Sequence, residues 1–203
     1  MSIRKVPLPL AAARAKPDEK HAGRRPALSV VQKGSHHSHH APRTIGCAIV
    51  TVSDTRKAHD DQSGARAHEL LERAGHEVVR RAWVRDDIAA IRKAVRAALK
   101  LPAVDVVIVT GGTGLAKRDV TPEALAPLFQ RELPGFGELF RARSVAQVGA
   151  AAWLSRAAAG EAAGRLLVML PGSTPAVELA LEELLLPELA HAVRLLGRFQ
   201  PGE

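Results

Sequence analysis

Three strongly apolar runs, each the length of a β-strand, constrain the fold of this 203-residue chain more than any other feature. They are IGCAIVTV at 45–52, VDVVIVT at 104–110 and RLLVML at 165–170, and residues 76–84 predict one further strand. Runs of this kind are typical of strands that are covered on both faces. We therefore expect these strands to lie side by side in a buried sheet.

Helical patterns lie between the predicted strands. They predict helices over about 62–74, 88–99 and 122–131, and a final helix from about Pro175 with a further turn or helix from Pro187. Residues 134–163 predict helix and loop. Because strands that alternate with helices form right-handed crossovers, we expect an α/β fold with three α/β/α layers around a mostly parallel sheet.

The first 43 residues differ from the rest in composition. They are rich in Pro and Ala and carry nine Lys or Arg but two acidic residues, which predicts a disordered basic extension before a domain over 44–203. The HHSHH tract at 36–40 is either a solvated linker or an adventitious metal binder. The apolar patch at 6–13 is too short for a signal peptide, and no stretch approaches a membrane span. We expect a cytoplasmic protein.

Charge and cysteine content exclude several classes of protein. The net charge is +8, but most of it lies in the extension, which leaves the predicted domain nearly neutral. Aromatic residues make up 3% and tyrosine is absent, so nucleic acid is not an expected partner. The single cysteine, Cys47, excludes an intrachain disulfide and a Cys-rich metal site, and its place in an apolar run predicts a core residue.

Polar or glycine-rich turns follow all four predicted strands. Ser53 follows the first and Asp86 the second; Gly111-Gly112-Thr113-Gly114 follows Thr110, with Arg118 and Asp119 behind it, and Pro171-Gly172-Ser173-Thr174 follows the last. In parallel sheets ligands bind at the carboxyl ends of the strands. We expect these turns to meet at one edge.

Each of these turns also has a simpler interpretation. The GGTG turn either cradles an anion or is an ordinary strand–helix turn, and it matches neither a Walker A loop nor a dinucleotide fingerprint. Ser173 or Thr174 either marks a second anion site or merely caps a helix. Asp86 could likewise be a helix cap, and Asp119 could pair with Arg118.

Carboxylates beside two anion sites would repel a phosphorylated ligand. A Mg²⁺ ion held by Asp86 and Asp119 removes that conflict, because Mg²⁺ is commonly bound by one or two carboxylates together with substrate phosphates. Such a site suits phosphoryl or nucleotidyl transfer, which needs positioning and charge neutralisation rather than a protein nucleophile.

The motifs together resemble one known family, the molybdopterin-binding proteins of molybdenum cofactor biosynthesis, of MoaB/MogA type. The resemblance covers roughly residues 44–196 and is closest to the MoaB branch. It rests on Asp86-Asp87 and on the stretches TVSDT at 51–55, TGGTGLAKRDVTP at 110–122, PGFGELFR at 134–141, SRAAAG at 155–160 and PGS at 171–173.

The resemblance implies an enzyme that transfers AMP from Mg-ATP to the terminal phosphate of molybdopterin, with ATP as co-substrate and pyrophosphate as product. It implies catalytic and Mg²⁺-binding roles for Asp86 and Asp119. It also implies a homotrimer or homohexamer and a molybdotransferase partner protein. The implied molybdopterin- or nucleotide-binding residues are Ser53, Thr110, Gly111, Gly112, Thr113, Gly114, Arg118, Ser155, Arg156, Pro171, Gly172 and Ser173.

Two departures from the family pattern leave an alternative open. Arg85 stands where relatives often have Pro, and Ser173-Thr174 replaces the Asn/Gln-Pro of adenylyltransferases. The alternative is a non-catalytic molybdopterin-binding carrier or scaffold protein. Separately, the apolar and aromatic residues of 134–153 belong either to the core or to a subunit interface.

Overall fold

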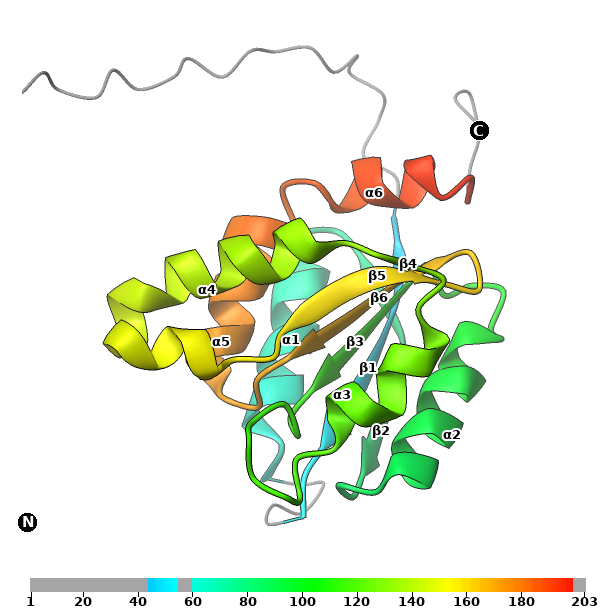
Figure 1. Ribbon diagram of the computed structural model, residues 1–203. Helices are drawn as coiled ribbons and strands as arrows, with labels where there is room; N and C mark the ends of the chain where they lie inside the picture. The colour runs from blue at the N-terminus through cyan, green and yellow to red at the C-terminus, as the bar shows by residue number, and fades with distance from the viewer. Residues whose placement is uncertain (1–43, 55–59, 199–203) are drawn as a thin grey trace, which may run out of the picture. The chain divides into compact units, whose positions relative to one another are not determined.

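The computed structural model describes residues 44–54 and 60–198, and its centre is a six-stranded sheet of order β2-β1-β3-β6-β5-β4 (Figure 1). Four strands are parallel to one another, and β5 runs antiparallel to β6 and β4 to β5. The bounds are β1 Gly46–Val52, β2 Glu77–Val84, β3 Val106–Thr110, β4 Arg131–Glu132, β5 Ala158–Ala162 and β6 Arg165–Leu170. The predicted α/β fold is confirmed. The extension predicted over 1–43, with its HHSHH tract, lies outside the described residues.

Helices cover both faces of the sheet and complete three layers (Figure 1). On one face lie α1 (Gln62–Arg73), α4 (Pro134–Val148), α5 (Thr174–Leu179) and α6 (Leu189–Leu195). On the other lie α2 (Ile88–Leu99) and α3 (Thr121–Leu125). Short 3₁₀ segments η2 (Ala126–Leu128) and η3 (Gly149–Leu154) and a π-helical segment η4 (Ala180–Leu185) join them. None of the helices in the described ranges is long and apolar enough to cross a membrane.

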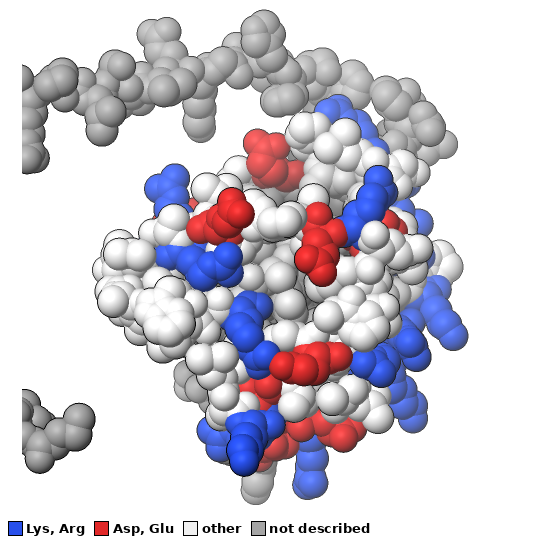
Figure 2. Space-filling model, viewed as in Figure 1, with Lys and Arg blue, Asp and Glu red and all other residues white. Residues whose placement is uncertain are grey.

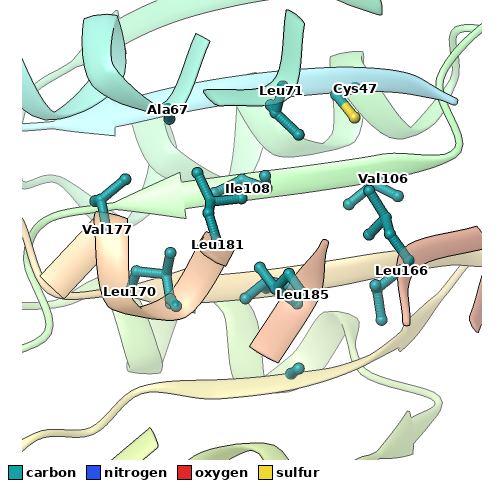
Figure 3. Packing of buried hydrophobic residues seen from close by; sticks show 14 of the residues in the cluster. Cys47, Ala67, Leu71, Val106, Ile108, Leu166, Leu170, Val177, Leu181 and Leu185 are labelled. Atoms are coloured by element: carbon teal, nitrogen blue, oxygen red, sulfur yellow. The ribbon is translucent and has the colours of Figure 1, made fainter. Parts of the chain in front are cut away.

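Alternation along the strands divides the core into two clusters. In β1, Cys47 and Ile49 face α1 and α5, whereas Ala48 and Val50 face α2. Figure 3 shows the cluster on the α1 and α5 side, where Leu181 of η4 and its neighbours pack against the sheet. This burial on both faces explains the strongly apolar runs in the sequence.

The interior position of Cys47 predicts an inert thiol. Burial, reinforced by the negative charge of Asp105, raises the pKa of Cys47 to about 12. Since the thiolate is the reactive form, native protein at pH 8 is expected to resist a thiol reagent for hours and to react fully within minutes in denaturant. Absorbance of the released chromophore measures both rates. Rapid stoichiometric labelling of native protein would contradict the burial.

Two parts of the sequence form structures other than those predicted. The helix expected over 122–131 ends at Leu125 and gives way to η2 and β4. Pro127 explains the break, because its ring lacks an N–H and crowds the preceding turn. Residues 134–163, expected to be helix and loop, also contain β5, whose sequence AAGEA has no β-branched or aromatic residue. Pairing with β6 holds it as a strand.

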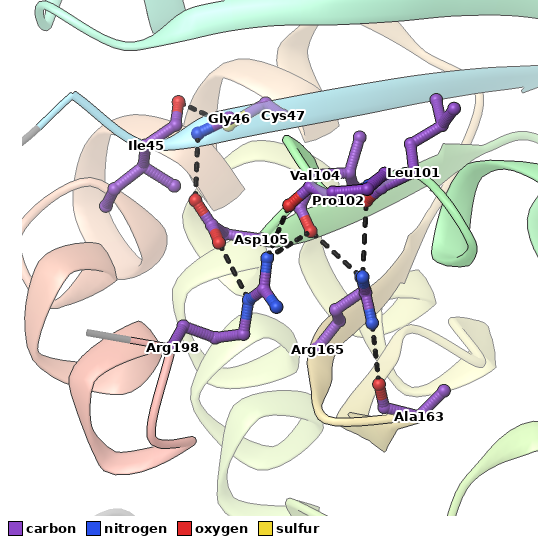
Figure 4. A network of polar contacts seen from close by, with 10 residues as sticks. All are labelled: Ile45, Gly46, Cys47, Leu101, Pro102, Val104, Asp105, Ala163, Arg165 and Arg198. Atoms are coloured by element: carbon purple, nitrogen blue, oxygen red, sulfur yellow. Dashed lines mark hydrogen bonds and ion pairs between the residues drawn. The ribbon is translucent and has the colours of Figure 1, made fainter.

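A network of polar contacts closes the sheet at the amino ends of its parallel strands (Figure 4). The Asp105 carboxylate accepts hydrogen bonds from Gly46 N–H (3.1 Å) and Arg198 Nε (2.9 Å). Nearby, the Arg165 guanidinium donates to the carbonyls of Val104, Ala163 and Leu101. Asp105 thus joins the start of β1 to Arg198 near the end of the described domain. These contacts lie at the amino ends of the parallel strands, away from their carboxyl ends.

Candidate functional site

A cavity of about 980 Å³ lies at the carboxyl ends of β1, β2, β3 and β6. The four turns expected to meet there do so, and a further wall comes from α4 and η3. The residues predicted for the site that line this cavity are Ser53, Asp86, Thr110, Gly111, Gly112, Thr113, Gly114, Arg118, Asp119, Ser155, Pro171, Gly172 and Ser173.

The GGTG turn has a fixed backbone and a row of unused N–H donors. Gly111 N–H donates to Leu170 O, and Gly112 O accepts from Thr121 N–H, both at 3.0 Å. Among the described residues, the N–H groups of Gly112, Thr113, Gly114 and Leu115 have no acceptor. Consecutive free N–H groups of this kind can bind an anion.

Glycine is required at 112 for two reasons. Its φ of +64° lies in the left-handed region. A Cβ there would also lie 2.3 Å from Asp86 Oδ1 and 2.4 Å from Thr121 Oγ1. The hydroxyl of Thr121 donates to Gly111 O at 2.8 Å, and Val120 occupies the N-cap position of α3. Thr121 therefore supports the turn.

Asp86 is a carboxylate of the cavity whose surroundings shift its pKa. Burial, and then the charges of Asp54 and Asp119, raise its pKa, while Arg118 opposes the shift. Its Oδ1 is buried and has no hydrogen-bond partner among the described residues. The alternative role as a helix cap is wrong, because Asp87 caps α2 by accepting from Ala90 N–H at 2.7 Å.

Asp119 also lines the cavity, and its charge contributes to the raised pKa of Asp86. Its Oδ2 accepts from Ala116 N–H at 3.1 Å, and it forms no ion pair with Arg118 within the described part of the chain. A Cβ on Gly114 would lie 2.6 Å from the same Oδ2. Glycine at 114 therefore makes room for the carboxylate.

These carboxylates fit a Mg²⁺ ion that takes its other ligands from water and phosphate. Asp86 offers a buried oxygen with no protein donor, and oxygen is the ligand that Mg²⁺ prefers. No group of three or more His, Cys, Asp or Glu side chains in the described ranges could hold a metal ion by itself. These side chains could therefore supply only some of the ligands of a bound Mg²⁺ ion.

The turn after β6 packs directly against the GGTG turn. Thr110 Oγ1 donates to Pro171 O at 3.0 Å, and a Cβ on Gly172 would lie 3.1 Å from Gly111 Cα. Ser173 occupies the N-cap position of α5, but its side chain makes no capping hydrogen bond. Helix capping therefore does not account for the hydroxyl of Ser173.

The sequence interpretation missed several polar residues of the cavity, among them Asp54, Asp61 and Gln147. Asp54 accepts the N–H of Asp86 at 3.2 Å and contributes to its raised pKa. Asp61 is buried and accepts from Thr51 Oγ1 and Gly64 N–H, both at 2.8 Å. The third is Gln147, in the wall formed by α4. The pattern D-x-S-G before α1 is a capping signal that could have indicated Asp61.

Arg156, predicted to bind molybdopterin or nucleotide, does not line the cavity. Its guanidinium lies behind the GGTG turn and donates to Thr113 O, Gly114 O and Asp119 O. It also forms an ion pair with Glu123. Arg156 therefore joins the start of β5 to the turn and to α3.

The apolar residues of 134–153 divide between core and surface. Phe140 is buried beneath α5. Leu139, Val145 and Val148 are each more than half exposed, and Trp153 is 72% exposed. Figure 2 shows an uncharged surface where α4 ends and η3 follows, and this surface is here called the α4–η3 surface. The core interpretation thus holds for Phe140, and the subunit-interface interpretation of the exposed residues stays a prediction.

A comparison with known families decides where the chain belongs. The family described as "Probable molybdopterin binding domain" matches residues 48–191, which include every strand turn of the cavity. The chain belongs to this family. The MoaB/MogA resemblance stated from the motifs is thereby confirmed.

Individual relatives support the same family assignment by sequence identity. The chain is 47% identical over 156 residues to Molybdenum cofactor biosynthesis protein B of Bacillus cereus, covering 76% of this chain and 92% of that protein. It is 45% identical over 159 residues to the protein of the same name from Bacillus subtilis, covering 78% and 94%.

Solved structures of this family share the fold. A crystal structure of Molybdenum cofactor biosynthesis protein B superposes with a TM-score of 0.76 at 46% identity, covering 79% of this chain and 100% of that one. The tungsten cofactor synthesizing protein MoaB from Pyrococcus furiosus superposes with a TM-score of 0.64 at 37% identity, covering 76% and 98%.

Proposed function

We propose that this protein acts in molybdenum cofactor biosynthesis, where it binds molybdopterin and adenylylates its terminal phosphate with Mg-ATP. The family and the names of its relatives support the pathway. The observation that carries the reaction is the row of free N–H groups at 112–115 beside the unpaired Oδ1 of Asp86. Anion donors next to a cation-binding carboxylate match a phosphate that is bound together with Mg²⁺.

In the proposed reaction, an oxygen of the molybdopterin phosphate attacks the α-phosphorus of ATP. A new P–O–P bond forms, the bond from the α-phosphorus to the bridging oxygen breaks, and pyrophosphate leaves. The GGTG turn and the turn at 171–173 hold the phosphates in line, which is the main requirement of such transfers. Asp86 and Asp119 would hold Mg²⁺, which would neutralise phosphate charge when bound.

A non-catalytic carrier is the alternative function, and the turn after β6 favours it. Ser173-Thr174 stands where the adenylyltransferase pattern has Asn/Gln-Pro. A carrier would bind molybdopterin in the same cavity and would have no affinity for Mg-ATP. The exposed apolar α4–η3 surface supports the further proposal of a homotrimer or homohexamer.

Calorimetry separates the two functions. The enzyme is expected to bind both molybdopterin and a non-hydrolysable ATP analogue with Mg²⁺. Asp119→Asn should keep molybdopterin affinity within about threefold and weaken the Mg²⁺-dependent binding of the analogue about a hundredfold, because one charged ligand is lost. Binding of molybdopterin alone by the unaltered protein would favour the carrier, and binding of neither ligand would contradict both functions.

A further inference from the structure

Arg156 lies behind the GGTG turn, on the side away from the cavity. We propose that it is a positioning residue, which turns the peptide planes of the loop so that the N–H groups of Gly114 and Leu115 are presented to a phosphate. This role differs from a direct contact with the ligand. The inference rests on the proposed function, because that function supplies the phosphorylated ligand.

The contacts of Arg156 are the first support. Its Nε donates to Thr113 O at 3.3 Å, and its Nη2 donates to Gly114 O at 2.5 Å and Asp119 O at 2.8 Å. Its Nη1 meets Glu123 Oε1 at 2.5 Å. The planar guanidinium thus uses several of its fixed donors at once, and three of them hold carbonyls of a single loop.

The geometry of the peptide bond gives these contacts a consequence. In a planar trans peptide, the C=O of one residue and the N–H of the next point in opposite directions. Because Thr113 O and Gly114 O face Arg156, the N–H groups of Gly114 and Leu115 must point away from it. Neither N–H has an acceptor among the described residues.

A glycine-rich loop needs such an external constraint. Gly114 lies outside the sheet and the helices, and glycine loses more conformational freedom on ordering than other residues. Without Arg156, the two peptide planes could rotate and their N–H groups would no longer be held pointing away from position 156. The same guanidinium fixes the backbone of Asp119, whose carboxylate lines the cavity. Arg156 therefore couples the anion donors to one of the proposed Mg²⁺ ligands.

Arg165 provides a matched control within the same chain. It also donates to three backbone carbonyls, at 2.9 Å, 2.9 Å and 3.2 Å, but at the far edge of the sheet (Figure 4). Its removal should lower stability through the same kind of contact and leave the cavity unchanged. A difference between Arg156→Ala and Arg165→Ala thus reports on the loop rather than on the fold.

The test uses the full chain labelled with ¹⁵N-glycine and ¹⁵N-leucine and inorganic pyrophosphate as the probe. In the unaltered protein, the amide signals of Gly114 and Leu115 are expected to move on titration. Arg156→Ala should weaken pyrophosphate binding about tenfold and abolish both shifts, and added guanidinium ion should restore them. Arg165→Ala should leave the pyrophosphate Kd within about twofold of the unaltered value, and the amide signals of Gly114 and Leu115 should still move.

Arg156→Lys separates positioning from charge. A lysine keeps the positive charge, but one ammonium group cannot hold three carbonyls in a plane, so binding should also weaken about fivefold. This variant also serves if Arg156→Ala does not fold. Unaltered binding in Arg156→Lys, or amides of Gly114 and Leu115 that do not respond in the unaltered protein, would overturn the inference. Failure of adenylyl transfer with these results intact would contradict the proposed function alone.

Discussion

Asp86→Asn is expected to raise the melting temperature of this protein by about 2 °C while reducing adenylyl transfer about a thousandfold. Burial and the charges of Asp54 and Asp119 raise the pKa of Asp86, so its ionised form is less stable in the folded state than in the unfolded state. Asparagine removes that penalty. It also removes the charge that would hold Mg²⁺, which explains the loss of turnover.

The pH dependence of this effect has a definite sign. With its folded pKa above the unfolded value, the Asp86 carboxyl favours folding fully below the unfolded pKa and loses that contribution as pH rises through the folded pKa. The melting temperature of Asp86→Asn should therefore exceed that of the unaltered protein at neutral pH, and the difference should vanish below about pH 4. Calorimetric scans across this range measure it.

Asp87→Ala is the matched control. Asp87 caps α2 and does not line the cavity, so its loss should lower the free energy of unfolding by about 1 kcal/mol and leave turnover unchanged. The neighbouring aspartates are thus expected to change stability in opposite directions. An Asp86→Asn variant that melts earlier than the unaltered protein, or that keeps its turnover, would remove the functional interpretation of Asp86.

Gly112→Ala is expected to lower the free energy of unfolding by about 3 kcal/mol or more and to abolish ligand binding. The new methyl group would overlap Asp86 Oδ1 at 2.3 Å and Thr121 Oγ1 at 2.4 Å in a backbone conformation that alanine rarely adopts. Relief of the overlap requires movement of the Asp86 side chain or of the turn. Urea denaturation and molybdopterin titration measure the two consequences.

Gly75→Ala isolates the part of this effect that comes from backbone strain. Gly75 has a φ of +83° after the last turn of α1, but a Cβ there would meet no atom within 4 Å. Its replacement should therefore cost about 1 kcal/mol, with ligand binding intact. Equal losses of stability in the two variants would mean that Asp86 does not lie against Gly112.

The buried sheet was predictable because its four parallel strands carry a strong local signal. The two antiparallel strands do not. β5 reads AAGEA and depends on its pairing with β6, and the two strands are joined through Ala163 and Gly164, both with positive φ. That conformation is typical of a tight hairpin turn, but Ala-Gly is not among the dipeptides from which such a turn is predicted. Pairing between strands, rather than local sequence, therefore determines that this edge of the sheet forms.

The candidate site divides in the same way. Residues that directly follow a parallel strand, such as Asp86 and Gly112, could be placed by topology, because strand ends meet at one edge. The wall formed by α4 and η3 could not, because Gln147 carries no motif that links it to the strand ends. Arg156 illustrates a third case. Its motif indicated that it lies near the site, but the sequence carries no signal for the side of the GGTG turn on which its guanidinium lies.

The most direct test of the central claim follows radioactive phosphate from ATP labelled at the α-position. Purified protein, Mg²⁺ and molybdopterin should together yield labelled adenylyl-molybdopterin and one unlabelled pyrophosphate for each transfer. Asp119→Asn should bind molybdopterin but transfer no label. If the unaltered protein binds molybdopterin yet leaves all label in ATP, this cavity stores the pterin and does not activate it.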